Sequence, residues 1–226
     1  GDPEAGWAYL LDGDFVAGGI PKEAFDRLIP GISTDNPLQR EGDNASVPRS
    51  FNVFDMPNGV RVVGGITCLG CHSGYLDDQF IIGLGNSFTN QTSDRSAGIT
   101  SLLDTFVRNT YGLNSPEWAA YEEFSRGSAL VGPFSRAPFR GLNPAFRIEE
   151  AAVSRRDPRS LRWIEDPASA LFEPNPEGLS SDTPAWWNIK KKAALYYNGM
   201  GRGRFTKMMM QISVVAIRDT HQAQEI

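Results

Sequence analysis

The chain has 226 residues, of which 40% are hydrophobic and 22% are charged, as in an ordinary globular domain. Its 22 basic and 27 acidic side chains give a formal net charge of -5, which argues against nucleic acid as a partner. The longest apolar run, 212–217, is far shorter than the roughly 20 residues that span a bilayer, so no transmembrane segment is expected. The length suits a single domain over residues 1–226.

The first part of the chain predicts one short helix and one β-hairpin among loops. Pro21 precedes the run 22–29 and is a typical first residue of a helix. Two runs rich in β-branched and aromatic residues, 51–54 and 60–63, flank Pro57-Asn58-Gly59, and its Asn-Gly pair is a hairpin signal. This hairpin leads directly to a cysteine motif.

That motif is Cys68-Leu69-Gly70-Cys71-His72, in the order C-x-x-C-H. This order is the attachment signal for a c-type haem. The two thiols form thioethers with the two vinyl groups of the porphyrin, and the adjacent imidazole comes under the iron as its proximal ligand. The motif therefore predicts one covalently attached haem c, held by Cys68 and Cys71, with His72 as an iron ligand.

Two cysteines at this spacing can also serve in a zinc site, a redox pair or a disulfide. A structural zinc site needs four ligands, but the chain contains only two cysteines and two histidines, the second being His221. A thioredoxin-type redox pair is expected after a strand in a βαβ unit, and no such unit follows. A redox or structural disulfide is the alternative that stays open.

Beyond the motif, the sequence predicts further helices separated by irregular chain. The glycines of 79–85 favour a tight turn or a close approach, because no phosphate-binding pattern follows them. An amphipathic stripe predicts a helix over 100–111, and Ser115 before a proline predicts the start of a helix through 118–124. The proline-rich segment 127–182 is expected to be irregular and to wrap a surface or a cofactor.

Near the end, Thr183-Pro184 predicts the start of a helix over 185–197, and a second helix is expected over 204–217. The fold class expected from these elements is mainly α: a cytochrome c-like haem domain with long irregular loops and a short β-hairpin.

Several short motifs occur in order over nearly the whole chain. They are Gly1-Asp2-Pro3-Glu4-Ala5-Gly6-Trp7, Gly19-Ile20-Pro21, Asn36-Pro37-Leu38, Pro57-Asn58-Gly59-Val60, the haem motif with Ser73-Gly74, Gly83-Leu84-Gly85-Asn86, and Thr183-Pro184-Ala185-Trp186-Trp187-Asn188-Ile189-Lys190-Lys191-Lys192. Their order resembles the first, N-terminal haem domain of the di-haem cytochrome c peroxidase-like family, on the branch that includes rubber oxygenases. The resemblance implies a second C-x-x-C-H domain beyond Ile226, or else a mono-haem form.

The sixth ligand of the iron decides what such a haem does. Met200, between two glycines, is a candidate ligand through its thioether, and packing is the alternative role of a loop methionine. His221 is the only other histidine. The resemblance implies an open or water-bound iron for oxygen-active members of the family.

Two kinds of side chain near the C-terminus are further candidates for haem contacts. Trp186 and Trp187 are adjacent, so only one of them can face the haem ring squarely. We predict that Trp187 contacts the haem, and packing in the core is the alternative role. No acidic residue occurs between Thr183 and Arg218. Arg202 and Arg204 are therefore candidates for ion pairs with the haem propionates, whereas the nearby lysine run is expected to be a solvated face.

Two functions follow as hypotheses. The first is electron transfer by a c-type cytochrome to a redox partner protein or a neighbouring haem domain. The second is a peroxidase- or oxygenase-type enzyme with an open iron site, working with a second haem domain, although no acid-base pair is evident in the sequence. Haem c is attached outside the cytoplasm, so a periplasmic or extracellular protein whose leader was removed is expected.

Overall fold

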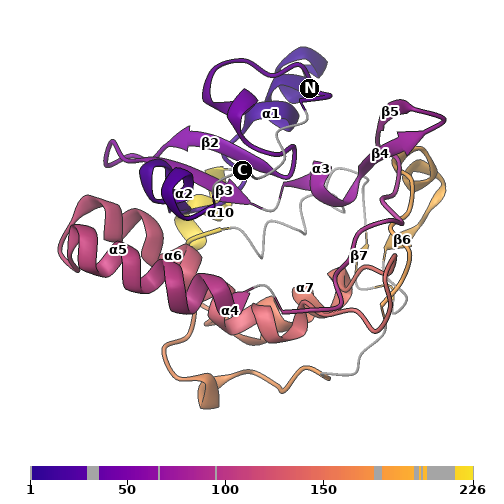
Figure 1. Cartoon of the computed structure of the whole chain (residues 1–226). Coiled ribbons are helices and arrows are strands. Elements are labelled where there is room, and N and C mark those ends of the chain that lie inside the picture. The colour runs from indigo at the N-terminus through magenta and orange to yellow at the C-terminus, as the bar shows by residue number, and fades with distance from the viewer. Residues whose placement is uncertain are drawn as a thin grey trace. The chain divides into compact units, whose positions relative to one another are not determined.

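The computed structural model describes residues 2–29, 36–65, 67–94, 96–175, 180–195, 199, 201–202 and 217–225. The chain divides into two compact units. Unit 1 contains residues 1–70 and 96–129, and unit 2 contains residues 71–95 and 130–226. Figure 1 shows the elements of both units along the chain.

Unit 1 contains a small antiparallel sheet in the order β1-β3-β2. Its strands are β1 (Ile20–Pro21), β2 (Phe51–Asp55) and β3 (Arg61–Gly65). Strands β2 and β3 form the predicted hairpin, with Val53 opposite Val63. In the turn, Gly59 has a φ of +83°, a conformation that glycine adopts without steric cost.

The helices of unit 1 confirm the predictions for 22–29, 100–111 and 118–124. They are α1 (Pro3–Asp12), α2 (Lys22–Leu28), η1 (Gly42–Ser46), α3 (Cys68–Cys71), α4 (Ser96–Gly98), the π-helical η2 (Ile99–Leu103), α5 (Asp104–Tyr111) and α6 (Pro116–Val131). Helices α3 and α6 each run across a boundary between the units. Ser115 caps α6 as predicted, because its hydroxyl oxygen accepts a hydrogen bond from the N–H of Trp118 at 3.0 Å.

Tyr121 is the largest fully buried side chain in the core of unit 1. Its ring packs in a cluster with Phe25 and Val63, and its hydroxyl donates a hydrogen bond to the carboxylate of Asp104 at 2.8 Å. Ser125 donates to the same carboxylate oxygen at 2.6 Å. Burial, followed by the hydrogen bond with Asp104, raises the pKa of Tyr121, so the phenol stays protonated and continues to donate to this half-buried carboxylate.

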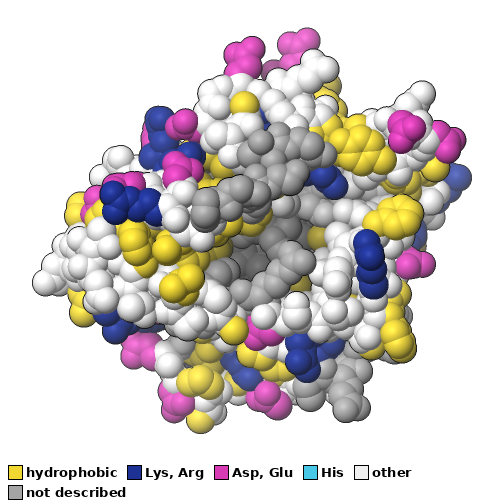
Figure 2. Space-filling model, in the orientation of Figure 1, with side chains coloured by type: hydrophobic (Ala, Val, Ile, Leu, Met, Phe, Trp, Pro, Cys, Tyr) yellow, Lys and Arg dark blue, Asp and Glu magenta, His cyan; other side chains and the backbone are white. Residues whose placement is uncertain are grey.

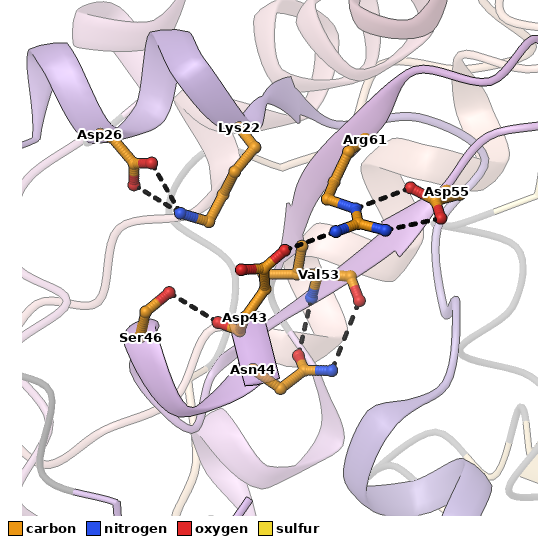
Figure 3. Close-up of polar contacts among 8 residues, drawn as sticks. All are labelled: Lys22, Asp26, Asp43, Asn44, Ser46, Val53, Asp55 and Arg61. Atoms are coloured by element: carbon orange, nitrogen blue, oxygen red, sulfur yellow. Dashed lines mark hydrogen bonds and ion pairs between the residues drawn. The ribbon is translucent and has the colours of Figure 1, made fainter. Parts of the chain in front are cut away.

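Polar side chains hold the outer edge of the hairpin (Figure 3). The guanidinium of Arg61 pairs with Asp55 and Asp43, each at 2.8 Å. The amide of Asn44 pairs with the backbone of Val53, accepting its N–H at 2.8 Å and donating to its carbonyl at 3.4 Å. Because β2 is an edge strand, Asn44 occupies backbone groups that would otherwise be open to another strand.

Unit 2 begins with a second hairpin and continues through short helices. Its elements are β4 (Ser73–Leu76), β5 (Gln79–Ile82), η3 (Gly132–Phe134), α7 (Ala145–Ser154), η4 (Pro167–Ser169), η5 (Trp186–Lys191), β6 (Ala194–Leu195), β7 (Gly201–Arg202) and α10 (Thr220–Glu225). Strand β4 pairs with β5, and β6 pairs with β7, both antiparallel. A core cluster of unit 2 contains Phe134, Ala151 and Trp163, and the guanidinium of Arg156 lies 3.7 Å from the centre of the Trp163 ring.

Three predictions of the fold need correction. The mainly α class is wrong: about 43% helix and 15% strand, with small antiparallel sheets, make the fold mixed α/β. Segment 127–182 is not irregular throughout, because it contains the end of α6 and all of α7. The helix over 185–197 is also wrong: the described residues of this segment form the 3-10 helix η5 and then β6.

The 3-10 conformation of η5 has a physical reason. Trp186 is half-buried and Ile189 is buried, and these residues are three positions apart, which matches the three-residue repeat of a 3-10 helix. The chain is extended again at Lys192 and enters β6. The helix expected over 204–217 lies outside the described residues. In the described part of the chain, no helix is both long and apolar enough to cross a membrane.

Candidate haem-attachment site

The two cysteines of the C-x-x-C-H motif lie on the single helical turn α3 (Cys68–Cys71). Residues three apart on a helix project from the same side, so this turn places the two thiols as neighbours. The two cysteines form no disulfide, and both are half-buried. Leu69 between them is buried, and the N–H of Gly70 donates to the carbonyl of Thr67 at 3.0 Å. Cys71 and His72 belong to unit 2, where the contacts described below are made.

The backbone of unit 2 fixes the end of the motif at two points. The N–H of Asn86 donates to the carbonyl of Cys71 at 2.9 Å, and the N–H of Gly83 donates to the carbonyl of His72 at 2.8 Å. Gly83 has a φ of +85°, which confirms the tight turn predicted for this glycine-rich segment. At Gly85, a Cβ atom would lie 1.8 Å from the carbonyl oxygen of Thr183, so only glycine fits there without displacing the backbone.

The imidazole of His72 is half-buried, and burial lowers its pKa. A hydrogen bond to the backbone of Pro184 opposes this shift. Its Nδ1 atom is buried and has no hydrogen-bond partner within normal geometry. A lowered pKa keeps the ring neutral near pH 7, which is the form that binds metals.

Trp186 lies beside this imidazole. The two ring centroids are 5.3 Å apart and the ring planes are inclined by 30°. The backbone N–H of Trp186 donates to the carbonyl of Gly83 at 2.9 Å, so the segment that fixes the backbone of His72 also fixes that of Trp186. Trp187, the tryptophan named from the sequence, is 51% exposed. Adjacency alone could not decide between the two, because the choice depends on the local 3-10 geometry.

Cys71 contacts polar side chains that sequence reasoning missed. Burial raises the pKa of the Cys71 thiol, and hydrogen bonds with Asn143 and Gln91 oppose this effect. Asn143 is itself buried: its amide donates to the hydroxyl of Thr183 at 3.0 Å and accepts from the N–H of Ala145 at 2.7 Å. The pair Asn143-Pro144 could have predicted a cap at the start of α7. It could not have predicted a contact with Cys71.

The remaining predicted haem contacts lie elsewhere or outside the described residues. Arg202 is exposed in β7, and its Nε donates to the carbonyl of Gly199 at 2.7 Å. Met200 and Arg204 lie outside the described residues. Within the described ranges, no three His, Cys, Asp or Glu side chains gather into a group that could hold a metal ion.

The residues present fit a haem c. This cofactor needs two thiols to form thioethers and one imidazole from the motif, and it does not need a cluster of three metal-binding side chains. Cys68 and Cys71 form no disulfide, and the buried Nδ1 of His72 has no partner within normal hydrogen-bond geometry. Trp186 supplies an aromatic wall beside the imidazole.

Comparisons of the chain with protein-family models, with curated proteins and with solved structures found no match. The similarity to di-haem peroxidase-like proteins therefore depends on the order of the sequence motifs.

Proposed function

We propose that this chain is a c-type cytochrome that carries one covalent haem c and transfers single electrons. Cys68 and Cys71 hold the cofactor, and His72 is the proximal iron ligand. The observation that carries the proposal is a pair of cysteines on one helical turn, in no disulfide, followed by a half-buried imidazole that packs against Trp186. The order of the family motifs supports a relation to the first haem domain of di-haem peroxidase-like proteins, and hence a location outside the cytoplasm.

Attachment needs no oxidant. Each thiol adds its sulfur to one carbon of a vinyl group and its proton to the other carbon, so one S–C bond replaces one S–H bond and the vinyl double bond becomes single. Asn143 and Gln91 hydrogen bond to the thiol of Cys71 and hold its direction. The bound haem supplies the one-electron redox chemistry.

The protein residues around His72 orient the ligand. Gly83 holds the backbone of His72, and Trp186 lies against the imidazole and limits its rotation. Burial keeps the ring neutral, so it does not have to lose a proton before it binds iron.

The first experiment measures covalent attachment. The chain, expressed in cells that mature c-type cytochromes, should have the intact mass of the polypeptide plus one haem. The Cys68→Ala/Cys71→Ala double variant should have the mass of the polypeptide alone, and His72→Ala should lose the native haem spectrum. His221→Ala is the matched control, because His221 is exposed in α10. A wild-type chain without haem, or a native-like spectrum in His72→Ala, would contradict the proposal.

A second measurement separates electron transfer from oxygen or peroxide chemistry. The reduced holoprotein is compared with and without carbon monoxide. We expect a low-spin spectrum that carbon monoxide leaves unchanged, which requires both axial positions of the iron to be filled. A high-spin form that binds carbon monoxide would favour the enzyme with an open iron site instead.

A further inference from the structure

The outer face of η5 carries an exposed tryptophan and a run of lysines. The inner face of this 3-10 helix presents the half-buried Trp186 and the buried Ile189. The outer side chains belong to Trp187, Lys190 and Lys191, and Lys192 follows directly; all four residues are exposed. We call these four residues the η5 face. Hydrophobic side chains also reach the surface elsewhere on the molecule, as Figure 2 shows, so exposure of Trp187 alone would carry little weight.

The η5 face is positively charged. Among the described residues, no carboxylate forms an ion pair with Lys190, Lys191 or Lys192. The sequence contains no acidic residue from Thr183 to Arg218, although the whole chain has a net charge of -5. A compact positive face on an acidic protein favours a partner of opposite charge.

The composition of the face also matches that of protein interfaces. Tryptophan is enriched among the residues that dominate binding energy, whereas charged residues at the rim steer the encounter. Trp187 supplies the apolar anchor, and the three lysines follow it closely in sequence. Trp186, the residue before this anchor, lies against the imidazole of His72. A partner on the η5 face would therefore dock next to the proposed iron ligand.

We propose that the η5 face is the docking surface for an acidic redox protein. This inference rests on the proposed electron-transfer function and adds the place and the charge of the partner. An anionic membrane would also attract lysines beside a tryptophan. The contact of Trp186 with His72 favours a redox protein, because electron transfer requires the partner to dock near the iron ligand and membrane binding does not.

The test follows reduction of the oxidised holoprotein by reduced flavodoxin, an acidic electron donor, in a stopped-flow spectrometer. We expect the second-order rate constant to fall as ionic strength rises, because salt screens the attraction. Lys191→Glu should lower the rate at low ionic strength by roughly threefold or more, and Lys190→Glu/Lys191→Glu/Lys192→Glu by roughly tenfold or more. The matched control is Arg159→Glu, an exposed charge reversal elsewhere in unit 2, which should leave the rate nearly unchanged.

Reduction by dithionite, a small donor that needs no protein docking surface, should proceed at similar rates in the wild type and the lysine variants. Equal decreases of the flavodoxin rate constant in Lys191→Glu and Arg159→Glu, or a rate constant that does not change with ionic strength, would overturn the proposal. Phosphatidylglycerol vesicles provide the other comparison: vesicle binding that the triple variant loses, with an unchanged flavodoxin rate, would assign the face to membranes and overturn it too. Failure of haem attachment is seen earlier, in the intact mass, and so is distinguishable.

Discussion

Asn143 connects three segments of unit 2 through one side chain. Its amide bonds to Thr183 and to the N-terminus of α7 at Ala145, and it hydrogen bonds to Cys71. We expect Asn143→Ala to lower the free energy of unfolding of the apoprotein by about 1–3 kcal/mol, because it leaves buried groups without partners. With the direction of the Cys71 thiol released, part of the holoprotein should carry only one thioether.

Two measurements check this prediction: urea unfolding of the apoprotein and the reduced pyridine haemochrome spectrum of the holoprotein. An unreacted vinyl group moves the α band of that spectrum to longer wavelength. Asn58→Ala is the control, because Asn58 lies in the turn of unit 1 and bonds to the carbonyl of Pro116. An unshifted band in Asn143→Ala would show that Asn143 has no part in directing the thiol.

At the residue scale, local spacing was enough to name Cys68, Cys71 and His72 as candidates. Local spacing was not enough to predict which side chains contact these three residues. Trp186 lies beside His72, and its backbone N–H bonds to the carbonyl of Gly83, which is distant in sequence. Asn143 is likewise distant from Cys71 in sequence. Such contacts depend on tertiary structure, which residue type and spacing do not encode locally.

At the element scale, the close approach of two loops at Gly85 makes a strong prediction. Gly85→Ala would place a Cβ atom 1.8 Å from the carbonyl oxygen of Thr183, so the two backbones would have to separate. We expect the free energy of unfolding to fall by about 3 kcal/mol. Gly98→Ala in α4 is the matched control, since its Cβ meets nothing within 4 Å. Urea unfolding measures both, and equal stability of the two variants would refute the steric argument.

Elements with strong local signals were predicted well. The Asn-Gly turn gave the β2–β3 hairpin, and the Ser115 cap gave the start of α6. The prediction of a helix over 185–197 was wrong, because it relied on alanines, lysines and a leucine that favour an α-helix by intrinsic propensity. There the burial of Trp186 and Ile189 and the pairing of β6 with β7 outweigh that propensity. Helix propensity differs by less than about 1 kcal/mol per ordinary residue, so tertiary contacts can reverse it.

At the scale of the whole molecule, the described core residues form clusters that each lie within one unit. Each unit has a tryptophan at its core: Trp118 packs against the cluster of unit 1, and Trp163 belongs to that of unit 2. We expect Phe134→Ala to destabilise unit 2 by about 3 kcal/mol, because it empties a buried ring site. The unfolding midpoint reported by Trp163 should therefore fall further than that reported by Trp118.

Apoprotein variants that retain a single tryptophan, either Trp118 or Trp163, permit this comparison by fluorescence during urea unfolding. Phe25→Ala provides the reciprocal change, because Phe25 lies in the core of unit 1 and should shift the Trp118 signal more. Identical shifts of both reporters in both variants would mean that the two cores unfold as one cooperative unit.

The half-buried cysteines of α3 would have two competing fates before a haem is attached. If Cys68 and Cys71 attach a haem as proposed, a thiol that has not yet reacted can instead be oxidised, and a C-x-x-C pair can form a disulfide within the chain. A disulfide removes both nucleophiles at once, and outside the cytoplasm oxidising conditions favour it. The yield of mature protein should therefore depend on the supply of reductant as much as on the supply of haem.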